Sequence, residues 1–223
     1  IFHKLISEKI KVEPPLCVIN LGGIANITSI ESGEISDLGS QDIGPGNCLI
    51  DEWIKKNTNK KYDKGGLIAK SGKKDILILN QALDNHDNLK KKNILSYDTK
   101  DFDLSFVRGL SLEDGAATLT EFTGKLLAEA TLNYISKLKT KPKKILVCGG
   151  GRKNSTLINC LKDNMNIGNL VENIDNFGVD GDFIESQAFA YLAIRSFLNL
   201  PISFPKTTGC KHPSTGGKLV NNF

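Results

Sequence analysis

Short apolar runs separated by glycine-containing turns form the beginning of the chain. Residues 16–21, Leu-Cys-Val-Ile-Asn-Leu, are a continuous apolar run of strand length, and residues 24–30 form a second run after Gly22 and Gly23. A third short run, 34–39, follows the turn Glu-Ser-Gly-Glu. Runs joined by such short connections usually pair side by side, so we predict an antiparallel meander of three strands.

Helical spacing begins after Asn47, where Leu49, Ile50 and Trp53 fall on one side of a helix. Three- and four-residue spacing of apolar positions predicts further helices. They cover 73–85, 112–139, 152–164 and 182–199. The last is so rich in apolar residues that we expect it to be largely buried. Residues 10–15, 96–109 and the Pro- and Gly-rich tail 200–217 are interpreted as loops.

Two further strands are predicted at 143–148 and 168–175, each beside a predicted helix. The order is therefore three strands, several helices, and then strand, helix, strand, helix. This order predicts an α/β domain with a mixed sheet whose first three strands are antiparallel. It resembles one half of the actin-like, sugar-kinase (ribonuclease H-like) fold.

Composition favours an ordinary globular protein without a membrane span or a metal cage. The chain has 223 residues, of which 39% are apolar and 24% charged, and no apolar run approaches the roughly 18 residues of a span. Its 5 cysteines are scattered, without a C-x-x-C pair, which favours a reducing, cytoplasmic setting over disulfides or zinc. The same spacing predicts no metal site built from protein side chains.

A net charge of +4 raises the question of nucleic-acid binding. The lysines cluster in stretches such as Lys-Leu-Lys-Thr-Lys-Pro-Lys-Lys (137–144), without the arginines and aromatic residues that base-stacking surfaces require. We therefore interpret them as solvated surface lysines and expect no nucleic-acid partner.

Glycine turns supply two candidate sites for a phosphate or nucleotide. Gly22 and Gly23 lie between two predicted strands, and such a turn either closes a hairpin or holds a phosphate on its N–H groups. Gly149, Gly150 and Gly151 lie between a strand and a helix and are followed by Asn154. They form either a tight strand-to-helix turn or a nucleotide loop, and they match neither G-x-G-x-x-G nor a Walker motif.

Two acids are candidates for chemistry. Asp42 precedes Gly44-Pro45-Gly46, and Asn47 is a good N-cap for the next helix. Asp42 is either stabilised by the positive end of that helix or a fixed general base, with glycines that let a substrate approach. Glu185 stands near the start of an apolar helix, where it either interacts with the helix dipole or binds a hydroxyl group.

Six short stretches occur in a fixed order along the chain, and their combination is more specific than any one of them. These are Asn-Leu-Gly-Gly-Ile-Ala-Asn-Ile-Thr (20–28), Asp-Ile-Gly-Pro-Gly-Asn with Leu-Ile-Asp-Glu-Trp-Ile (42–54), Tyr-Asp-Lys-Gly-Gly (62–66), 112–123, Val-Cys-Gly-Gly-Gly-Arg-Lys-Asn (147–154) and 185–193. Together they resemble the C-terminal portion of the anhydro-N-acetylmuramic acid kinases, over about residues 15–217. We expect residues 1–14 to lead into a C-terminal domain at 15–223.

The resemblance implies an ATP-dependent enzyme that opens the 1,6-anhydro bridge of a cell-wall recycling sugar. Phosphorylation at O6 then gives N-acetylmuramic acid 6-phosphate. By the same resemblance, Asp42 activates the attacking water, and Gly44, Gly46, Asn47 and Glu185 belong to the sugar side. Gly22, Gly23, the triple glycine and Asn154 belong to the ATP side. Mg²⁺ would arrive with ATP, as is usual in phosphoryl transfer.

The chain departs from the family at its beginning. The glycine- and Ser/Thr-rich phosphate motif of the G-T-S-x-D-G type, expected in an N-terminal domain, does not occur before Asn20. The implied partners are therefore a separately encoded N-terminal half or a second copy in a homodimer. Two alternatives stay open: a truncated, inactive relative that keeps the fold and weak ligand binding, and an unrelated nucleotide-binding module built on the triple glycine.

Overall fold

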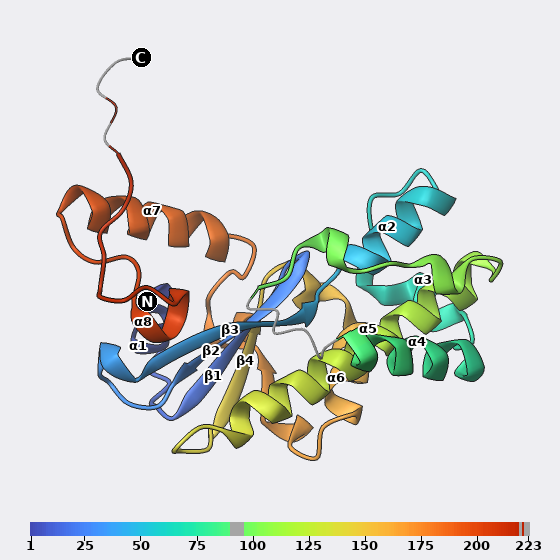
Figure 1. The fold of residues 1–223 in the computed structure, drawn as a ribbon, viewed down its shortest axis with the longest axis horizontal. Coiled ribbons are helices and arrows are strands. Elements are labelled where there is room, and N and C mark those ends of the chain that lie inside the picture. Colours follow the sequence, from blue (N-terminus) through green and yellow to red (C-terminus); the bar gives the residue numbers. More distant parts are fainter. Residues whose placement is uncertain (90–95, 219, 221–223) are drawn as a thin grey trace.

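A five-stranded mixed sheet organises the chain (Figure 1). The computed structural model describes residues 1–89, 96–218 and 220. The strand order is β3-β2-β1-β4-β5, with antiparallel pairs β3/β2 and β2/β1 and parallel pairs β1/β4 and β4/β5. The strand bounds are β1 Leu16–Leu21, β2 Ile24–Ile30, β3 Leu38–Pro45, β4 Lys144–Cys148 and β5 Val171–Asn173. The predicted α/β class and the antiparallel first three strands are confirmed.

The third strand was predicted too early in the chain. Residues Ile35–Asp37 form a 3-10 turn, and β3 begins only at Leu38. Its register pairs Leu38 with Ile30 and Pro45 with Ile24, so β3 matches the full length of β2. Residues 39–46 are mostly polar or glycine, so they lack the apolar spacing that predicts a strand. The strand forms because its backbone pairs with β2.

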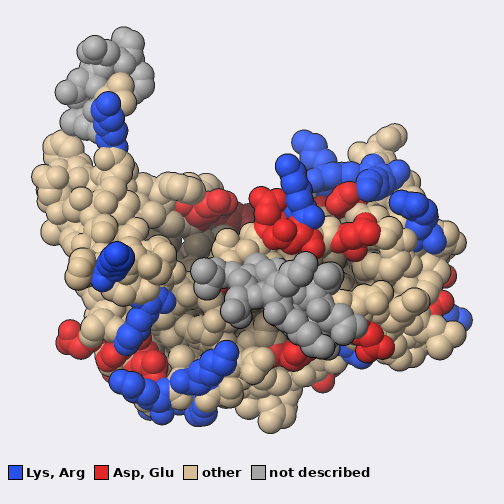
Figure 2. All heavy atoms as spheres, in the orientation of Figure 1, with Lys and Arg blue, Asp and Glu red and all other residues tan. Residues whose placement is uncertain are grey.

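Helices cover both faces of the sheet and extend beyond it. Their bounds are α1 Phe2–Lys9, α2 Cys48–Asn57, α3 Leu67–Ser71, α4 Ile76–Leu89, α5 Leu112–Ser136, α6 Ser155–Asp163, α7 Ile184–Phe197 and α8 Pro205–Thr208. In the described part of the chain, none of them is long and apolar enough to cross a membrane. Figure 2 shows two groups of acidic side chains facing each other between the part that carries α7 and the part that carries α2.

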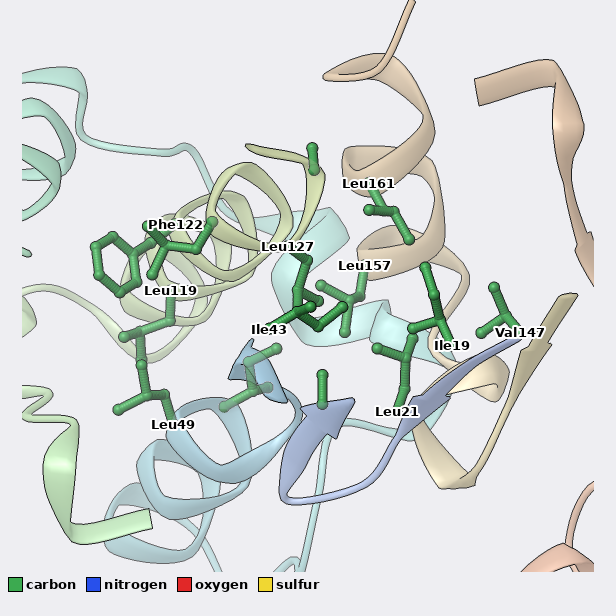
Figure 3. Packing of buried hydrophobic residues seen from close by; sticks show 14 of the residues in the cluster. Ile19, Leu21, Ile43, Leu49, Leu119, Phe122, Leu127, Val147, Leu157 and Leu161 are labelled. Atoms are coloured by element: carbon green, nitrogen blue, oxygen red, sulfur yellow. The ribbon is translucent and has the colours of Figure 1, made fainter. Parts of the chain in front are cut away.

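Alternate residues of β1 belong to two separate apolar clusters. Ile19 and Leu21 pack with residues of α2, α5 and α6, including Leu49, Leu127 and Leu157 (Figure 3). Leu16 and Val18 belong to the other cluster, together with Leu146 of β4 and Ile6 of α1. The alternation follows from the two-residue period of a strand that is buried on both faces.

Helix α1 is a finding that the sequence pattern did not predict. Phe2, Ile6 and Ile10 recur at four-residue spacing, and Ile6 is buried. Nδ1 of His3 lies 2.8 Å from Oγ1 of Thr28 on β2, which ties the helix to the sheet. The segment 10–15 that follows is a loop, as predicted.

Helix α7 is mostly exposed, which contradicts the prediction that it is largely buried. Ile184 is its one residue classed as buried, whereas Phe189 is 67% and Phe197 69% exposed. Its ring contact with α1 joins Phe2 and Tyr191 at 5.9 Å between centroids, and Figure 1 shows α7 beside α1 and α8, away from the sheet. An apolar sequence predicts burial only where a covering surface exists, and the described residues cover little of this helix.

Candidate functional site

The carboxyl ends of β1 and β4 bring the two glycine turns to one edge of the sheet. These strands are parallel, and their register pairs Asn20 with Cys148. Gly22 and Gly23 follow β1 directly, and Gly149 begins the turn after β4. Strand β3 ends at the same edge, because Pro45 pairs with Ile24. The sheet therefore assembles candidates that are more than 100 residues apart in sequence.

The Gly22-Gly23 turn holds the start of α2 through its carbonyl groups. The carbonyl of Gly23 accepts hydrogen bonds from the N–H groups of Gly46 at 2.9 Å and Cys48 at 3.3 Å, and the carbonyl of Gly22 accepts one from Asn47 at 2.8 Å. Asn47 stands at the predicted N-cap position, but its side chain makes no capping hydrogen bond. The backbone of the glycine turn caps this helix instead.

Gly46 fits this junction only because it lacks a side chain. A Cβ at this position would lie 2.1 Å from the carbonyl oxygen of Gly22, far inside van der Waals contact. Gly44 has a φ of +137°, which also favours glycine. Gly46 therefore has a packing role at the junction, and Gly44 has a backbone conformation that favours glycine, whatever either contributes to a ligand.

The three glycines after β4 divide into two that pack and one that is open. A Cβ at Gly149 would lie 2.5 Å from Oδ1 of Asn20, and one at Gly151 would lie 2.8 Å from Nδ2 of Asn47. Gly150 is exposed, and a Cβ there would meet nothing within 4 Å. The turn thus presents the bare backbone of Gly150 outward.

Asn154 acts as the N-cap of α6 and is buried. Its Oδ1 accepts a hydrogen bond from the N–H of Leu157 at 3.0 Å. The next residues bind the loop that contains Gly65 and Gly66: Ser155 and Thr156 donate from their hydroxyls to the two glycine carbonyls, at 2.9 and 2.8 Å. Asn154 therefore caps α6, and the two residues after it hold the Gly65-Gly66 loop against the start of this helix.

A cavity of about 270 Å³ opens beside Gly150, and we call it the glycine-edge cavity. Its lining residues are Asn47, Asp51, Tyr62, Asp63, Gly65, Gly150, Lys153, Asn154 and Asp182. Its volume lies just below the 300–1,000 Å³ of typical small-molecule sites, so it would hold part of a nucleotide. Three of the predicted site residues, Asn47, Gly150 and Asn154, meet here.

Arg152 joins the glycine loop to the segment before α7. Its side chain is 2% exposed, and its Nε lies 2.9 and 3.0 Å from the two carboxylate oxygens of Asp175. Its Nη1 donates to Asp182 at 2.8 Å and to the carbonyl of Gly149 at 3.1 Å. A buried guanidinium with several acceptors is well satisfied, and it fixes the wall of the cavity on the α7 side.

Among the acids that line the glycine-edge cavity, Asp51 differs from the other two. Asp63 accepts hydrogen bonds from the N–H groups of Ile68 and Ala69, both at 2.9 Å. Asp182 is paired with Arg152 and Lys153. Within the described residues, the Asp51 carboxylate has neither a hydrogen bond nor an ion pair. Burial raises its pKa to about 6, an increase that Lys55 opposes and Asp63 adds to.

Asp42 lies in a second and larger cavity, of about 850 Å³, which we call the β3 cavity. It stands within β3 opposite Asn26, three residues before the end of the strand. It therefore lies about 10 Å from the edge of the sheet that carries the two glycine turns, which we call the glycine edge. One carboxylate oxygen, Oδ2, accepts the N–H of Tyr97 at 3.0 Å. Asn26, His86, Tyr97, Glu129 and Lys137 are among the other lining residues.

The structure therefore groups most of the predicted site residues but separates Asp42 from the nucleotide candidates. Gly22, Gly23, Gly46, Asn47 and Gly149–Gly151 meet at the glycine edge. Asp42 faces the β3 cavity instead. Glu185 is exposed on the first turn of α7 and lines neither cavity.

Several residues of the two cavities were missed from the sequence. Asp51 and Tyr62 lie inside motifs that carried the family resemblance, yet nothing in their spacing marked them as lining residues. Tyr97 reaches Asp42 across 55 positions of sequence. The one available signal was the helical position of Asp51, four residues after Asn47 and therefore on the same side of α2.

Comparison of structures supports the fold class. The activator of the 2-hydroxyisocaproyl-CoA dehydratase from Clostridium difficile, solved with bound ADPNP, superposes with a TM-score of 0.50 at 12% identity, covering 87% of this chain and 68% of that chain. The chain thus shares the actin-like ATPase fold, as predicted.

Comparison of sequences defines the family. The family model for anhydro-N-acetylmuramic acid kinase matches residues 1–222. The kinase of that name from Pelagibacter ubique is 52% identical over all of this chain and 60% of its own length. The one from Zymomonas mobilis is 45% identical over 98% of this chain and 57% of its own length. The chain belongs to the anhydro-N-acetylmuramic acid kinase family, and it spans somewhat over half the length of these relatives.

Substitution of Gly46 tests the junction between the glycine turn and α2. Gly46→Ala is expected to lower the free energy of unfolding by about 1–3 kcal/mol, because the new Cβ would overlap the Gly22 carbonyl. Gly33→Ala is the control, since a Cβ there meets nothing within 4 Å, and it should change stability by less than about 0.5 kcal/mol. Urea denaturation measures both. Equal effects of the two variants would contradict the assignment.

The pH dependence of stability tests the environment of Asp51. Its pKa rises from 3.8 to about 6 on folding, so its contribution to stability is complete below pH 4 and is lost as the pH rises through about 6. Asp51→Asn cannot ionise and is expected to be more stable than the parent above pH 6, by on the order of 1 kcal/mol after allowance for partial exposure. Urea denaturation from pH 4 to 7.5 measures the difference. A constant difference across this range is the contradicting result.

Proposed function

We propose that the chain carries the catalytic base and one wall of the ATP site of an anhydro-N-acetylmuramic acid kinase. The observation that carries the proposal is the position of Asp42. It faces a cavity large enough for a sugar, on the strand that leads to the glycine edge. Family membership supports the reaction, since the relatives that match this chain bear the kinase name.

In the proposed reaction, Asp42 removes a proton from a water molecule in the β3 cavity. The water oxygen bonds to the anomeric carbon of the sugar, and the bond from that carbon to O6 breaks. O6 then attacks the γ-phosphorus of ATP, and the bond from that phosphorus to ADP breaks. The hydrogen bond from the Tyr97 N–H to one oxygen of Asp42 orients the carboxylate and leaves its other oxygen for the proton.

The glycine edge suits the ATP side of this reaction. Gly150 offers open backbone for close approach, and the glycine-edge cavity has room for part of a nucleotide. The C. difficile activator of the same fold was solved with ADPNP, which supports a nucleotide in this fold. Mg²⁺ would enter with the ATP phosphates, as is usual in phosphoryl transfer.

The remaining wall of the site is proposed to come from the part of the family's length that this chain does not span. The P. ubique kinase extends well beyond the matched region, since the match covers 60% of it. The exposed apolar residues of α7 give such a portion a surface to cover. The alternative partner, a second copy in a homodimer, and the cytoplasmic location stay predictions.

Substitution of Asp42 tests the catalytic assignment. Asp42→Asn is expected to reduce ATP-dependent conversion of anhydro-N-acetylmuramic acid by at least about 10³-fold while sugar binding changes little, because the amide cannot accept the proton. Product formation is followed by mass spectrometry and binding by calorimetry. Asp163→Asn, an exposed acid at the end of α6, is the matched control and should retain activity. Retained turnover in Asp42→Asn would refute the role as base.

Addition of the N-terminal portion of the P. ubique kinase tests the partner. Joined to this chain, it is expected to raise turnover by at least about 100-fold, because phosphoryl transfer depends on groups aligned from both walls. Replacing the exposed Phe189 and Phe197 by Ser should reverse most of the gain. Leu77→Ser is the control, since Leu77 is 83% exposed but lies on α4. Full turnover by the chain alone would contradict the need for a second portion.

A further inference from the structure

The half-buried carboxylate of Asp51 is an acceptor that the protein itself leaves unused. Of the other acids that line the glycine-edge cavity, Asp63 accepts hydrogen bonds from two backbone N–H groups, and Asp182 forms ion pairs with Arg152 and Lys153. Among the described residues, no donor reaches Asp51. An ionised group that loses water without gaining a partner destabilises the fold, and a ligand that supplies hydrogen-bond donors would remove that cost.

The position of Asp51 is fixed by a hydrogen bond in the first turn of α2 and by an anchor in the middle of the helix. Its N–H donates to the carbonyl of Asn47 at 2.8 Å, in the turn that the Gly22 and Gly23 carbonyls cap. Two residues later, Nε1 of Trp53 donates to the carbonyl of Leu112 at 2.9 Å and anchors α2 to α5. A carboxylate on such a rigid turn loses little conformational freedom when it binds a ligand.

The chemistry of the cavity favours hydroxyl donors over a cation. Asp63 and Asp182 line the same cavity but are paired elsewhere, and among the described residues no three acidic, His or Cys side chains are grouped so that they could hold a metal ion. A carboxylate has two oxygens side by side, each able to accept a hydrogen bond. A vicinal diol presents two O–H donors at a matching separation, so a diol would satisfy both oxygens at once.

The surroundings of the cavity indicate which diol it receives. One wall is the open backbone of Gly150, and another is Tyr62, whose side chain is 56% exposed and available for stacking on a base. We propose that Asp51 accepts hydrogen bonds from the 2′- and 3′-hydroxyls of the ATP ribose and so makes the site selective for ribonucleotides. This inference rests on the proposed function, in which the glycine edge binds ATP.

Paired measurements of affinity test the inference. Dissociation constants for Mg·ATP and Mg·2′,3′-dideoxy-ATP are measured by calorimetry on the 223-residue chain joined to the N-terminal portion of the P. ubique kinase, and on variants of this joined protein. The parent is expected to bind ATP at least about 10-fold more tightly than the dideoxy analogue, since hydrogen bonds to a charged group are stronger than those between neutral groups. In Asp51→Ala the ratio should fall below about 3-fold through loss of ATP affinity alone. Asp51→Asn, which keeps one acceptor, should give an intermediate ratio.

A neighbouring acid provides the control. Glu52→Ala, on the same helix, removes an exposed carboxylate that pairs with Lys56, and it should leave the parent ratio unchanged. Thermal unfolding verifies that each variant is folded. An unchanged ratio in Asp51→Ala, or equal losses for both nucleotides, would overturn ribose recognition and leave the proposed function standing. Failure of the folded parent to bind either nucleotide would overturn both.

Discussion

The contact between the Gly22-Gly23 carbonyls and the first N–H groups of α2 is the constraint on which the site depends. Three backbone hydrogen bonds join the β1–β2 turn to the end of β3. Because Gly46 is in direct contact with the turn, no side chain separates the two segments. The same junction sets the start of α2, hence the position of Asp51, and the end of β3, hence the position of Asp42. A backbone contact without side chains thereby connects both cavities.

The separation of the two cavities has a consequence for the chemistry. Asp42 stands about 10 Å along β3 from the edge that carries the glycine turns. A base and a phosphoryl donor act on different atoms of the proposed sugar substrate, so they need not share one cavity. Arg152 supports the side proposed to bind the nucleotide, since one buried guanidinium joins the glycine loop to Asp175 and Asp182. The two halves of the proposed reaction are thus supported by different parts of the fold.

Helix α7 has an apolar sequence, yet most of its side chains are exposed. Its sequence is as apolar as that of a core helix, yet Phe189 and Phe197 are about two-thirds exposed. The relatives that match this chain are longer than it is. An exposed apolar helix of this kind is typical of a surface that meets another part of a protein or a partner, which agrees with the proposed second portion.

Periodicity in the sequence determined the strands β1, β2 and β4, the helices α2 and α5, and the α/β class, because these depend on local spacing of apolar residues. Motif order determined the family and marked Asp42 and the glycine turns. Only the tertiary structure decided that β3 runs to Pro45 and that Asp42 and Gly150 face different cavities. Each depends on pairing partners distant in sequence, as in the hydrogen bond from Tyr97 to Asp42, and local patterns carry no record of such partners.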